Sequence, residues 1–247
     1  MSDYIYTFQK GFNYSQDGPG NRLVFHLSGC NMFCPWCSNP EGLKKTEYIQ
    51  KYTIEEMLRE IISCRTMFFE NGGVTFTGGE VSLQANNLAL LIKELKKQNI
   101  NTCIETNASL KDTEKLVPLV DFMIADFKSP DKDILKSVTG ADIEIIKENL
   151  LKRAKTNEYL LIRIPLINNF NTGEENAENF ANYFKDLTTK SKSDNIFIEI
   201  LTYHEYGKDK YKKLNSAYNF SDGFVTEKQV EILKNELTKN NLKIIRT

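Results

Sequence analysis

Three of the five cysteines in this chain lie within eight residues, and their spacing suggests chemistry. Cys30, Cys34 and Cys37 form a C-x3-C-x2-C pattern that directly follows an apolar run, Leu23–Leu27. Three thiolates on a tight loop can hold three corners of a metal cluster, and no fourth cysteine lies nearby. Structural zinc sites usually have four protein ligands, so the pattern favours an iron–sulfur cluster with one open iron. The alternatives are a zinc site completed by His26 or a distant residue, and three unligated thiols.

The rest of the composition describes an ordinary globular protein. Cys64 and Cys103 lie in helix-like and strand-like patterns, where a free cysteine behaves as a small hydrophobic residue. An odd, crowded set of cysteines argues against a secreted disulfide framework. The net charge is -1, from 32 basic and 33 acidic residues, so the chain offers no global field for nucleic acid or an anionic membrane. With no long apolar run and no signal-like N-terminus, we expect a cytoplasmic protein without nucleic-acid or membrane partners.

Motifs with glycine or charged side chains follow the other apolar runs. They are Thr77-Gly78-Gly79-Glu80 after Val74–Phe76, Glu105-Thr106-Asn107, Asp126-Phe127-Lys128, and Tyr203-His204 after Ile196–Leu201. Glycines at a strand end allow backbone to approach a ligand closely. Arg163 lies inside an apolar strand pattern, where a buried guanidinium needs a partner such as a carboxylate. The structural alternatives are a tight turn, solvated strand ends, a core ion pair and a structural histidine.

Apolar runs and helical periodicity alternate along the chain and must position these motifs. The predicted strands are Tyr4–Lys10, Leu23–Leu27, Val74–Phe76, Thr102–Glu105, Asp121–Phe127, Tyr159–Leu166, Ile196–Leu201 and Leu242–Ile245. The predicted helices are Ile54–Phe69, Leu88–Lys97, Thr113–Leu119, Asp142–Ala154, Glu174–Leu187 and Thr226–Thr238. Thr53 with Glu56 forms a capping box, and Thr226 is a candidate N-cap.

This alternation gives about six βα units and predicts a parallel sheet in one domain, residues 1–247. The sheet is either doubly wound or closed into a full or partial (β/α) barrel, and periodicity does not choose between them. In both, chemistry belongs at the carboxyl ends of the strands. One long irregular segment, Tyr203–Gly223, has the length of a functional loop.

With Trp36 before its last cysteine, the cysteine loop resembles the signature of the radical S-adenosylmethionine (SAM) enzymes. The resemblance implies a [4Fe-4S] cluster on Cys30, Cys34 and Cys37 whose fourth iron is chelated by SAM. Reductive cleavage of SAM then yields a 5'-deoxyadenosyl radical that abstracts hydrogen from a substrate. Gly78-Gly79-Glu80 resembles the motif whose backbone contacts the SAM amino group.

Further motifs are similar to those of glycyl-radical-enzyme activating enzymes, the group that includes the pyruvate formate-lyase activase. They are Asp17-Gly18-Pro19-Gly20 with Arg22, Ser38-Asn39-Pro40-Glu41, Arg163-Ile164-Pro165-Leu166 and Tyr203-His204-Glu205-Tyr206-Gly207-Lys208. The resemblance implies a partial (β/α)6 barrel of the radical SAM type. It also implies a glycyl radical enzyme as protein substrate, with the Asp17–Gly20 turn near the partner's glycyl-radical loop, and a flavodoxin- or ferredoxin-type electron donor.

The same resemblance assigns the remaining site residues. The positions that bind or neighbour SAM are Trp36, Asp126, Lys128, Arg163 and His204, and those near a monovalent cation are Glu105, Thr106 and Asp126. Glu105 departs from the Asp of the pyruvate formate-lyase type, and Ser38 replaces a His. Only Cys64 lies between the cluster loop and Gly78, which indicates the short, single-cluster form.

No side chain is expected to act as an acid or base, because the cofactor carries the chemistry. Lysines in Tyr203–Gly223 are either part of a docking surface or simply solvated: Lys208, Lys210, Lys212 and Lys213. Two other functions remain open. One is a radical SAM enzyme acting on a small molecule or precursor peptide, and the other is a non-enzymatic metal-binding or electron-carrying protein.

Overall fold

The computed structural model describes residues 4–43 and 48–246 of this α/β chain. The chain divides into two compact units, which are described in turn. The first contains Met1–Asn31, Asn39–Thr106 and Leu110–Ile124, and the second contains Met32–Ser38, Asn107–Ser109 and Ala125–Thr247. None of the helices within the described ranges combines the length and hydropathy needed to span a membrane.

The first unit is built on a mixed sheet. Its strands are β1 (Tyr4–Tyr14), β2 (Asn21–Leu27), β3 (Gln50–Thr53), β4 (Gly73–Gly78) and β5 (Asn101–Thr106), in the order β3-β1-β2-β4-β5. β1 pairs antiparallel with β2 and β3, whereas β2, β4 and β5 run parallel. β2 and β4 are buried along nearly their whole length, as expected for central parallel strands.

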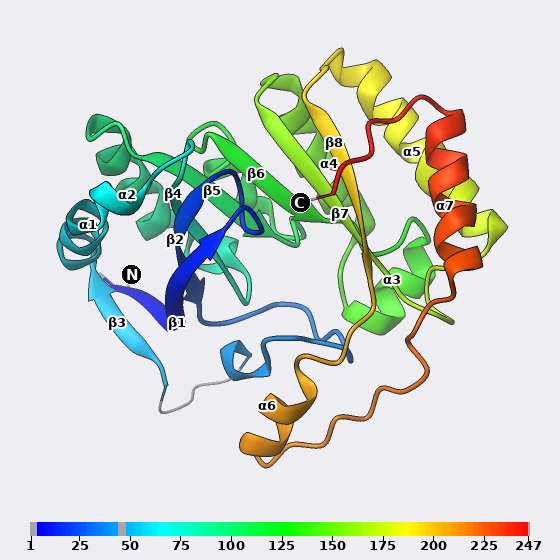
Figure 1. Ribbon diagram of the computed structural model, residues 1–247, viewed down its shortest axis with the longest axis horizontal. Coiled ribbons are helices and arrows are strands. Elements are labelled where there is room, and N and C mark those ends of the chain that lie inside the picture. The colour runs from blue at the N-terminus through cyan, green and yellow to red at the C-terminus, as the bar shows by residue number, and fades with distance from the viewer. Residues whose placement is uncertain (1–3, 44–47, 247) are drawn as a thin grey trace. The chain divides into compact units, whose positions relative to one another are not determined.

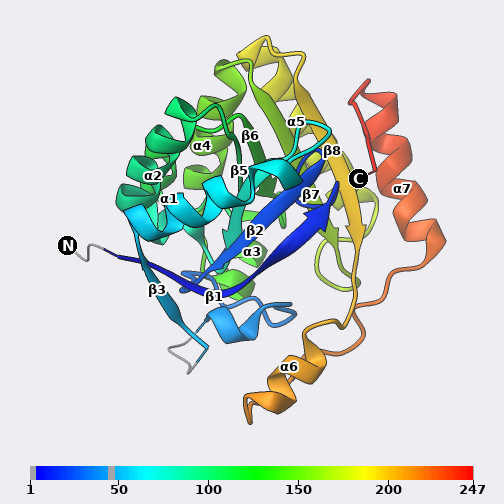
Figure 2. The ribbon, with the colours of Figure 1, turned by 60° about the vertical axis from the view of Figure 1, so that its left-hand side comes forward.

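Two amphipathic helices, α1 (Ile54–Ser63) and α2 (Ala85–Lys97), lie side by side over this sheet (Figures 1 and 2). α1 begins at the predicted capping box: the Thr53 hydroxyl accepts from the Glu56 N–H, and the Glu56 carboxylate accepts from the Thr53 N–H. Short 3-10 helices complete the unit: Pro40–Gly42, Arg65–Met67, Val81–Gln84 and Lys111–Lys115.

The second unit holds the later strands and helices. β6 (Phe122–Asp126) crosses from the first unit into the second, and β7 (Tyr159–Leu166) pairs parallel with β8 (Ile196–Thr202). The helices are α3 (Lys132–Thr139), α4 (Ile143–Lys155), α5 (Glu174–Ser191), α6 (Lys208–Lys213) and α7 (Glu227–Lys239). Its core includes the packed rings of Phe127, Phe180 and Phe184, and α7 packs against α5 (Figure 1).

Several predicted elements are wrong in extent or kind. The helix predicted over Ile54–Phe69 ends at Ser63 and gives way to the 3-10 turn, because the apolar Met67 and Phe69 are half exposed and bury no helical face. The helix predicted over Thr113–Leu119 is the 3-10 helix Lys111–Lys115. In place of a strand at Leu242–Ile245, one bridge joins Ile244 to Ile198. β3, α3 and α6 are absent from the prediction; all three are short, and β3 and α6 bury no side chain.

Candidate active site

In the first unit, the loop after β4 is hydrogen-bonded to the backbone that leads from β2 toward Cys30. The Gly79 N–H donates to the Leu27 carbonyl at 2.9 Å, and the Glu80 N–H donates to the Gly29 carbonyl at 2.7 Å. A Cβ on Gly79 would lie 1.9 Å from the Gly29 oxygen, and one on Gly78, at φ +117°, would lie 2.4 Å from the Leu27 nitrogen. Only glycine fits at either position, so this backbone cradle explains the Gly-Gly pair.

The Glu80 side chain fastens this loop to the end of β5. It is fully buried, and its Oε1 accepts from the Ser82 N–H at 3.0 Å and from the Thr106 hydroxyl at 2.6 Å. A buried carboxylate is stable only when such donors surround it. The structure therefore brings together two residues assigned to the site, Glu80 and Thr106, through a bond that holds the loop in place.

A second polar layer crosses the sheet of the first unit near the carboxyl ends of its strands. The parallel register aligns His26 with Thr77 on β4, and the Thr77 hydroxyl donates to the Glu105 Oε2 at 2.7 Å. Because side chains alternate along a strand, Glu105 and Thr106 point to opposite faces of the sheet. Glu105 is half-buried. The predicted role of Glu105 and Thr106 near a cation remains a prediction.

The predicted cluster ligands are divided between the two units. Cys30 belongs to the first unit, and Cys34 and Cys37 lie on one turn of the second, where the Cys37 N–H donates to the Cys34 carbonyl at 3.1 Å. None of the three forms a disulfide, and burial raises the pKa of Cys34 to about 11. The described residues contain no preformed group of three Cys, His, Asp or Glu side chains that could hold a metal ion.

The donor chemistry nevertheless fits an iron–sulfur cluster. Thiolate sulfur is the ligand that such clusters take, and the three cysteines are half-buried beside a tight turn. Metal binding to thiols releases their protons, so assembly of a cluster and the final placement of its ligands are coupled. The glycines at 78 and 79 let the loop after β4 lie directly against the backbone that leads to Cys30.

Trp36 anchors the turn between Cys34 and Cys37. Its ring is 8% exposed and packs against Phe170 at 4.6 Å and Phe220 at 5.3 Å between ring centroids. Ile167 and Tyr203 belong to the same buried cluster. The structure thus gives Trp36 a packing role in the second unit, and its assignment to cofactor binding remains a prediction.

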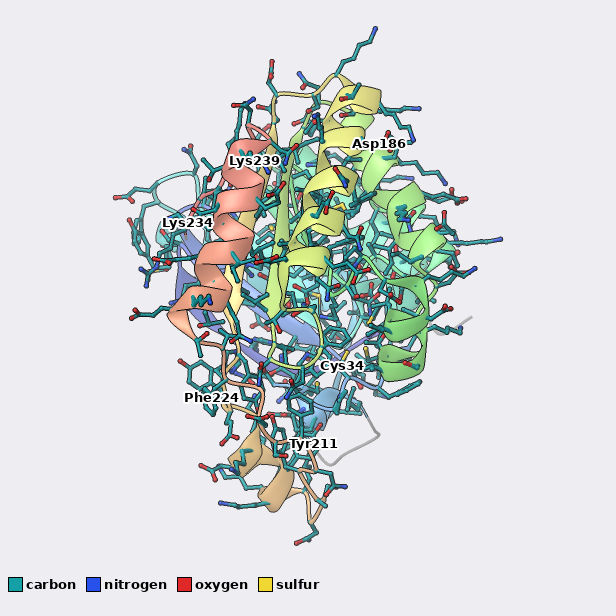
Figure 3. The ribbon with its side chains drawn as sticks, turned by 90° about the vertical axis from the view of Figure 1, so that its right-hand side faces the viewer. Cys34, Asp186, Tyr211, Phe224, Lys234 and Lys239 are labelled. Atoms are coloured by element: carbon teal, nitrogen blue, oxygen red, sulfur yellow. The ribbon has the colours of Figure 1, made fainter. Side chains whose placement is uncertain are left out.

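Sequence reasoning did not single out two contacts that brace the second unit. A Cβ on Gly207, which precedes α6, would lie 2.3 Å from the Cys37 carbonyl oxygen. Asn171, which is buried, donates from Nδ2 to the carbonyls of Lys128 and Pro165, while its Oδ1 accepts from the Ile167 N–H. In Figure 3, Cys34, Tyr211 on α6 and Phe224 gather at one end of this unit. The glycine within the Tyr203–Lys208 motif was the available signal for the first contact.

Charged residues at the end of β6 and inside β7 and β8 form local pairs in the second unit. Lys128 Nζ lies 2.7 Å from Asp126 Oδ2, and Arg163 Nε donates to Glu199 Oε2 at 2.8 Å. Glu199 is 3% exposed at its side chain, so it is the carboxylate that the buried Arg163 was expected to need.

His204, after β8, is half-buried and stacks on the exposed ring of Tyr206, with 4.0 Å between ring centroids. Burial lowers the pKa of His204 below its ordinary value of 6.5. The imidazole is therefore neutral at pH 7 and can accept a hydrogen bond as well as donate one.

Comparison with known proteins identifies the class. Residues 24–181 match the model of the Radical SAM superfamily. The chain is 32% identical to the pyruvate formate-lyase-activating enzyme of Clostridium pasteurianum, over 83% of this chain and 85% of that protein. The chain belongs to the radical SAM superfamily, whose members use a [4Fe-4S] cluster and SAM.

Other relatives narrow the comparison. A 4-hydroxyphenylacetate decarboxylase activating enzyme of Clostridioides difficile is 26% identical over 92% of this chain and 90% of that protein. A solved domain of the pyruvate-formate lyase-activating enzyme of Bacteroides vulgatus aligns with a TM-score of 0.56 at 26% identity, covering 70% of this chain and 98% of that one. Streptococcus suis SuiB bound to its precursor peptide SuiA shares the fold, with a TM-score of 0.65 at 16% identity over 90% of this chain and 48% of that one. The expected α/β fold class, a partial (β/α)6 barrel of the radical SAM type, is confirmed.

Proposed function

We propose that this radical SAM enzyme is an activase that removes the Cα hydrogen of one glycine in a partner enzyme and leaves a glycyl radical there. The observation that carries the proposal is that the relatives compared over more than four fifths of the chain are named as activating enzymes of two glycyl-radical systems. The Asp17-Gly18-Pro19-Gly20 turn, which resembles a partner-loop motif, supports the same assignment.

In this proposal the chain's own residues bind and orient the cofactors. Cys30, Cys34 and Cys37 hold the cluster, which together with SAM supplies a hydrogen-abstracting radical when one electron is delivered. The backbone of Gly78-Gly79-Glu80 would contact the SAM amino group, as the resemblance implies, from a loop that is fixed against the segment leading to Cys30. Proton transfer by a side chain is not required, because the step moves a hydrogen atom.

Paired side chains complete the proposed SAM site. Asp126 with Lys128, Arg163 with Glu199, and the neutral His204 supply hydrogen-bond donors and acceptors for the carboxylate and ribose of SAM. Glu105, Thr106 and Asp126 are the residues proposed, from the resemblance, to lie near a monovalent cation. Oxygen is the ligand atom that hard cations prefer.

The remaining parts of the proposal concern context. We propose one functional domain over residues 1–247, in the short form with a single cluster, and a flavodoxin- or ferredoxin-type electron donor. A reducing compartment such as the cytoplasm suits five cysteines that form no disulfide and a low-potential cluster. The alignment with the 4-hydroxyphenylacetate relative runs over 292 positions, more than this chain contains, which supports the absence of an inserted segment here.

Electron spin resonance tests the activase directly. The reconstituted protein is mixed anaerobically with SAM, a strong reductant, and either pyruvate formate-lyase or 4-hydroxyphenylacetate decarboxylase. An organic doublet on a partner is expected, together with 5'-deoxyadenosine detected by chromatography. SAM cleavage with both partners silent would shift the assignment to a small molecule or precursor peptide, and no cleavage at all would refute the enzyme.

Matched cysteine variants test the ligand assignment. Cys34→Ala is expected to lose the cluster and SAM cleavage together. Cys64→Ala is the control, because Cys64 caps the end of α1 in the other unit, and it should retain both. Iron content and the absorbance of the cluster report the outcome.

A further inference from the structure

Arg22 is a fully buried cation whose acceptors are all neutral. Its Nε donates to the Thr75 hydroxyl at 2.6 Å, and its Nη2 donates to the Val74 carbonyl at 2.8 Å. Nη1 donates to the Pro19 carbonyl at 3.1 Å and to Asn101 Oδ1 at 3.0 Å. No carboxylate in the described part of the chain pairs with it at ion-pair distance. A buried charge is costly, so this arrangement calls for a reason beyond packing.

The acceptors of Arg22 lead to the Asp17–Gly20 turn. The Pro19 carbonyl binds the guanidinium directly. The Thr75 hydroxyl, which accepts from Arg22, donates its own proton to the Asp17 carbonyl at 2.6 Å. One guanidinium and one hydroxyl thereby hold the backbone at both ends of Asp17–Pro19. These bonds are partly buried and come from residues of β2 and β4, so they fix the conformation of the turn.

Gly18 and Gly20 restrict the conformation of the same turn. Gly18 has φ +115°, and its Cβ would lie 3.0 Å from Arg22 Cδ and 3.3 Å from Cys103 Sγ. Gly20 has φ +66°, and its Cβ would lie 2.2 Å from the Glu70 carbonyl oxygen. Both positions need glycine for conformation and for space. The turn therefore packs closely against the residues beneath it, and larger side chains at these two positions would displace it.

The strand register relates this turn to the polar layer already described. Thr75 pairs with Cys103, so the turn covers the face of β4 and β5 that carries these two side chains. Thr77 and Glu105 follow two residues later on the same face, about 6.6 Å along the strands at 3.3 Å per residue. The turn thus lies on the same face as Glu105, one side-chain layer nearer the amino ends of the strands.

Within the turn, the carbonyls of Asp17, Pro19 and Gly20 accept hydrogen bonds, and the Asp17 carboxylate is the one charged group. It is half-buried, and its Oδ2 accepts from the Asn13 side-chain amide. We propose that Arg22 and Thr75 are positioning residues for partner recognition: through Pro19 and Asp17 they hold the turn in the shape that receives the partner's glycine-bearing loop. This inference rests on the proposed activase function.

The test separates partner recognition from cofactor chemistry. Thr75→Val removes the hydroxyl at nearly constant volume, so Arg22 Nε loses its acceptor and the Asp17 carbonyl loses its donor. We expect the apparent KM for the partner that wild type activates to rise at least on the order of tenfold, because two hydrogen bonds are lost and each is worth up to about that factor. SAM cleavage without partner should stay within about twofold of wild type, because Thr75 belongs to neither the cluster loop nor the cradle.

Three companion variants sharpen the test. Thr75→Ser keeps the hydroxyl and should restore the wild-type KM. Thr7→Val changes another buried strand threonine of the same unit, outside this network, and should leave KM unchanged. Asn101→Ala removes one acceptor of Arg22 at a half-buried position and should raise KM by a smaller factor. This variant keeps the inference testable if Thr75→Val does not fold.

Two results would overturn the inference. The first is a wild-type KM in Thr75→Val and Asn101→Ala. The second is a parallel fall in partner-free SAM cleavage, which indicates a general role in the fold. Failure of the proposed function is distinct from both, because wild type itself would then cleave SAM and leave pyruvate formate-lyase and 4-hydroxyphenylacetate decarboxylase without a radical.

Discussion

The contact between Gly207 and Cys37 allows a sharp test of how the second unit shapes the cluster loop. Gly207 has φ -75° and ψ -22°, a right-handed helical conformation that alanine adopts readily. Gly207→Ala therefore introduces no backbone strain at its own position. The added Cβ would lie 2.3 Å from the Cys37 oxygen and 3.1 Å from the Ser38 Cα, so its effect is steric.

The size of the effect follows from that distance. Real Cβ contacts are not shorter than 3.0 Å, so the Cys37 carbonyl or α6 must move by at least about 0.7 Å. Overpacking of this kind costs about 1–3 kcal/mol of stability. The Cys37 N–H is bonded to the Cys34 carbonyl, so a shift of Cys37 also moves the turn that carries the second thiol. A displacement near 1 Å can lower a rate on the order of 10²-fold.

The assay compares Gly207→Ala with Gly11→Ala after anaerobic reconstitution. Gly11, on β1, serves as the matched control, because a Cβ added there would meet no atom within 4 Å. Iron content, the electron spin resonance spectrum of the reduced cluster with and without SAM, and the yield of 5'-deoxyadenosine are measured. We expect Gly207→Ala to change the spectrum and reduce cleavage, and Gly11→Ala to match wild type.

The reasoning would be refuted if Gly207→Ala gave the wild-type spectrum and cleavage rate. It would also be refuted if Gly11→Ala produced the same loss, since the effect would then not pass through Cys37. A stability loss with a normal spectrum would show that α6 yields and the cluster loop stays in place.

Three further outcomes are expected. Glu199→Leu should lower the free energy of unfolding by about 3 kcal/mol, because it removes the nearly buried carboxylate that pairs with the Arg163 guanidinium; Glu60→Leu, in an exposed pair, should cost under about 1 kcal/mol, as urea unfolding will show. Lys192→Gly should raise stability by about 0.5–1 kcal/mol, because Lys192 ends α5 at φ +56°, a conformation that favours glycine; an unchanged urea midpoint would contradict this. Because the folded pKa of His204 is lowered, the unfolded chain binds a proton that the folded chain does not, and stability should fall as pH drops below 6.5; an NMR titration of its ring with a pKa at or above 6.5 would contradict this.

Elements with strong local signals were predictable from the sequence. β7 has the predicted bounds, Tyr159–Leu166, and α1 and α7 begin at the expected caps, Thr53 and Thr226, each with a complete capping box. Hydrophobic periodicity and capping interactions involve residues that are close in sequence, so a short stretch of sequence is enough to predict them. The ends of helices were less predictable. The apolar pattern of α1 continues to Phe69, yet burial stops at Ile61.

The candidate site was predictable in its motifs but not in its bracing. The Gly-Gly cradle and the carboxylate partner of Arg163 follow from general physical needs: close backbone approach and charge compensation. The hydrogen bonds from Asn171 to the Lys128 and Pro165 carbonyls, and the contact of Gly207 with Cys37, join segments that are separate in sequence. Spacing alone does not specify which distant backbone a small or polar residue will meet, because tertiary packing decides it.

Two arginines on strands, Arg163 and Arg22, have different kinds of hydrogen-bond acceptor. Both lie on strands whose residues are mostly buried, and both need acceptors. Arg163 donates to the carboxylate of Glu199, so the two charges offset each other directly. Arg22 donates to carbonyls, a hydroxyl and an amide oxygen, and its hydrogen bonds therefore fix the backbone around it. A cation retained at that cost is best explained by the turn it holds, which is why its variants should affect partner recognition before cofactor chemistry.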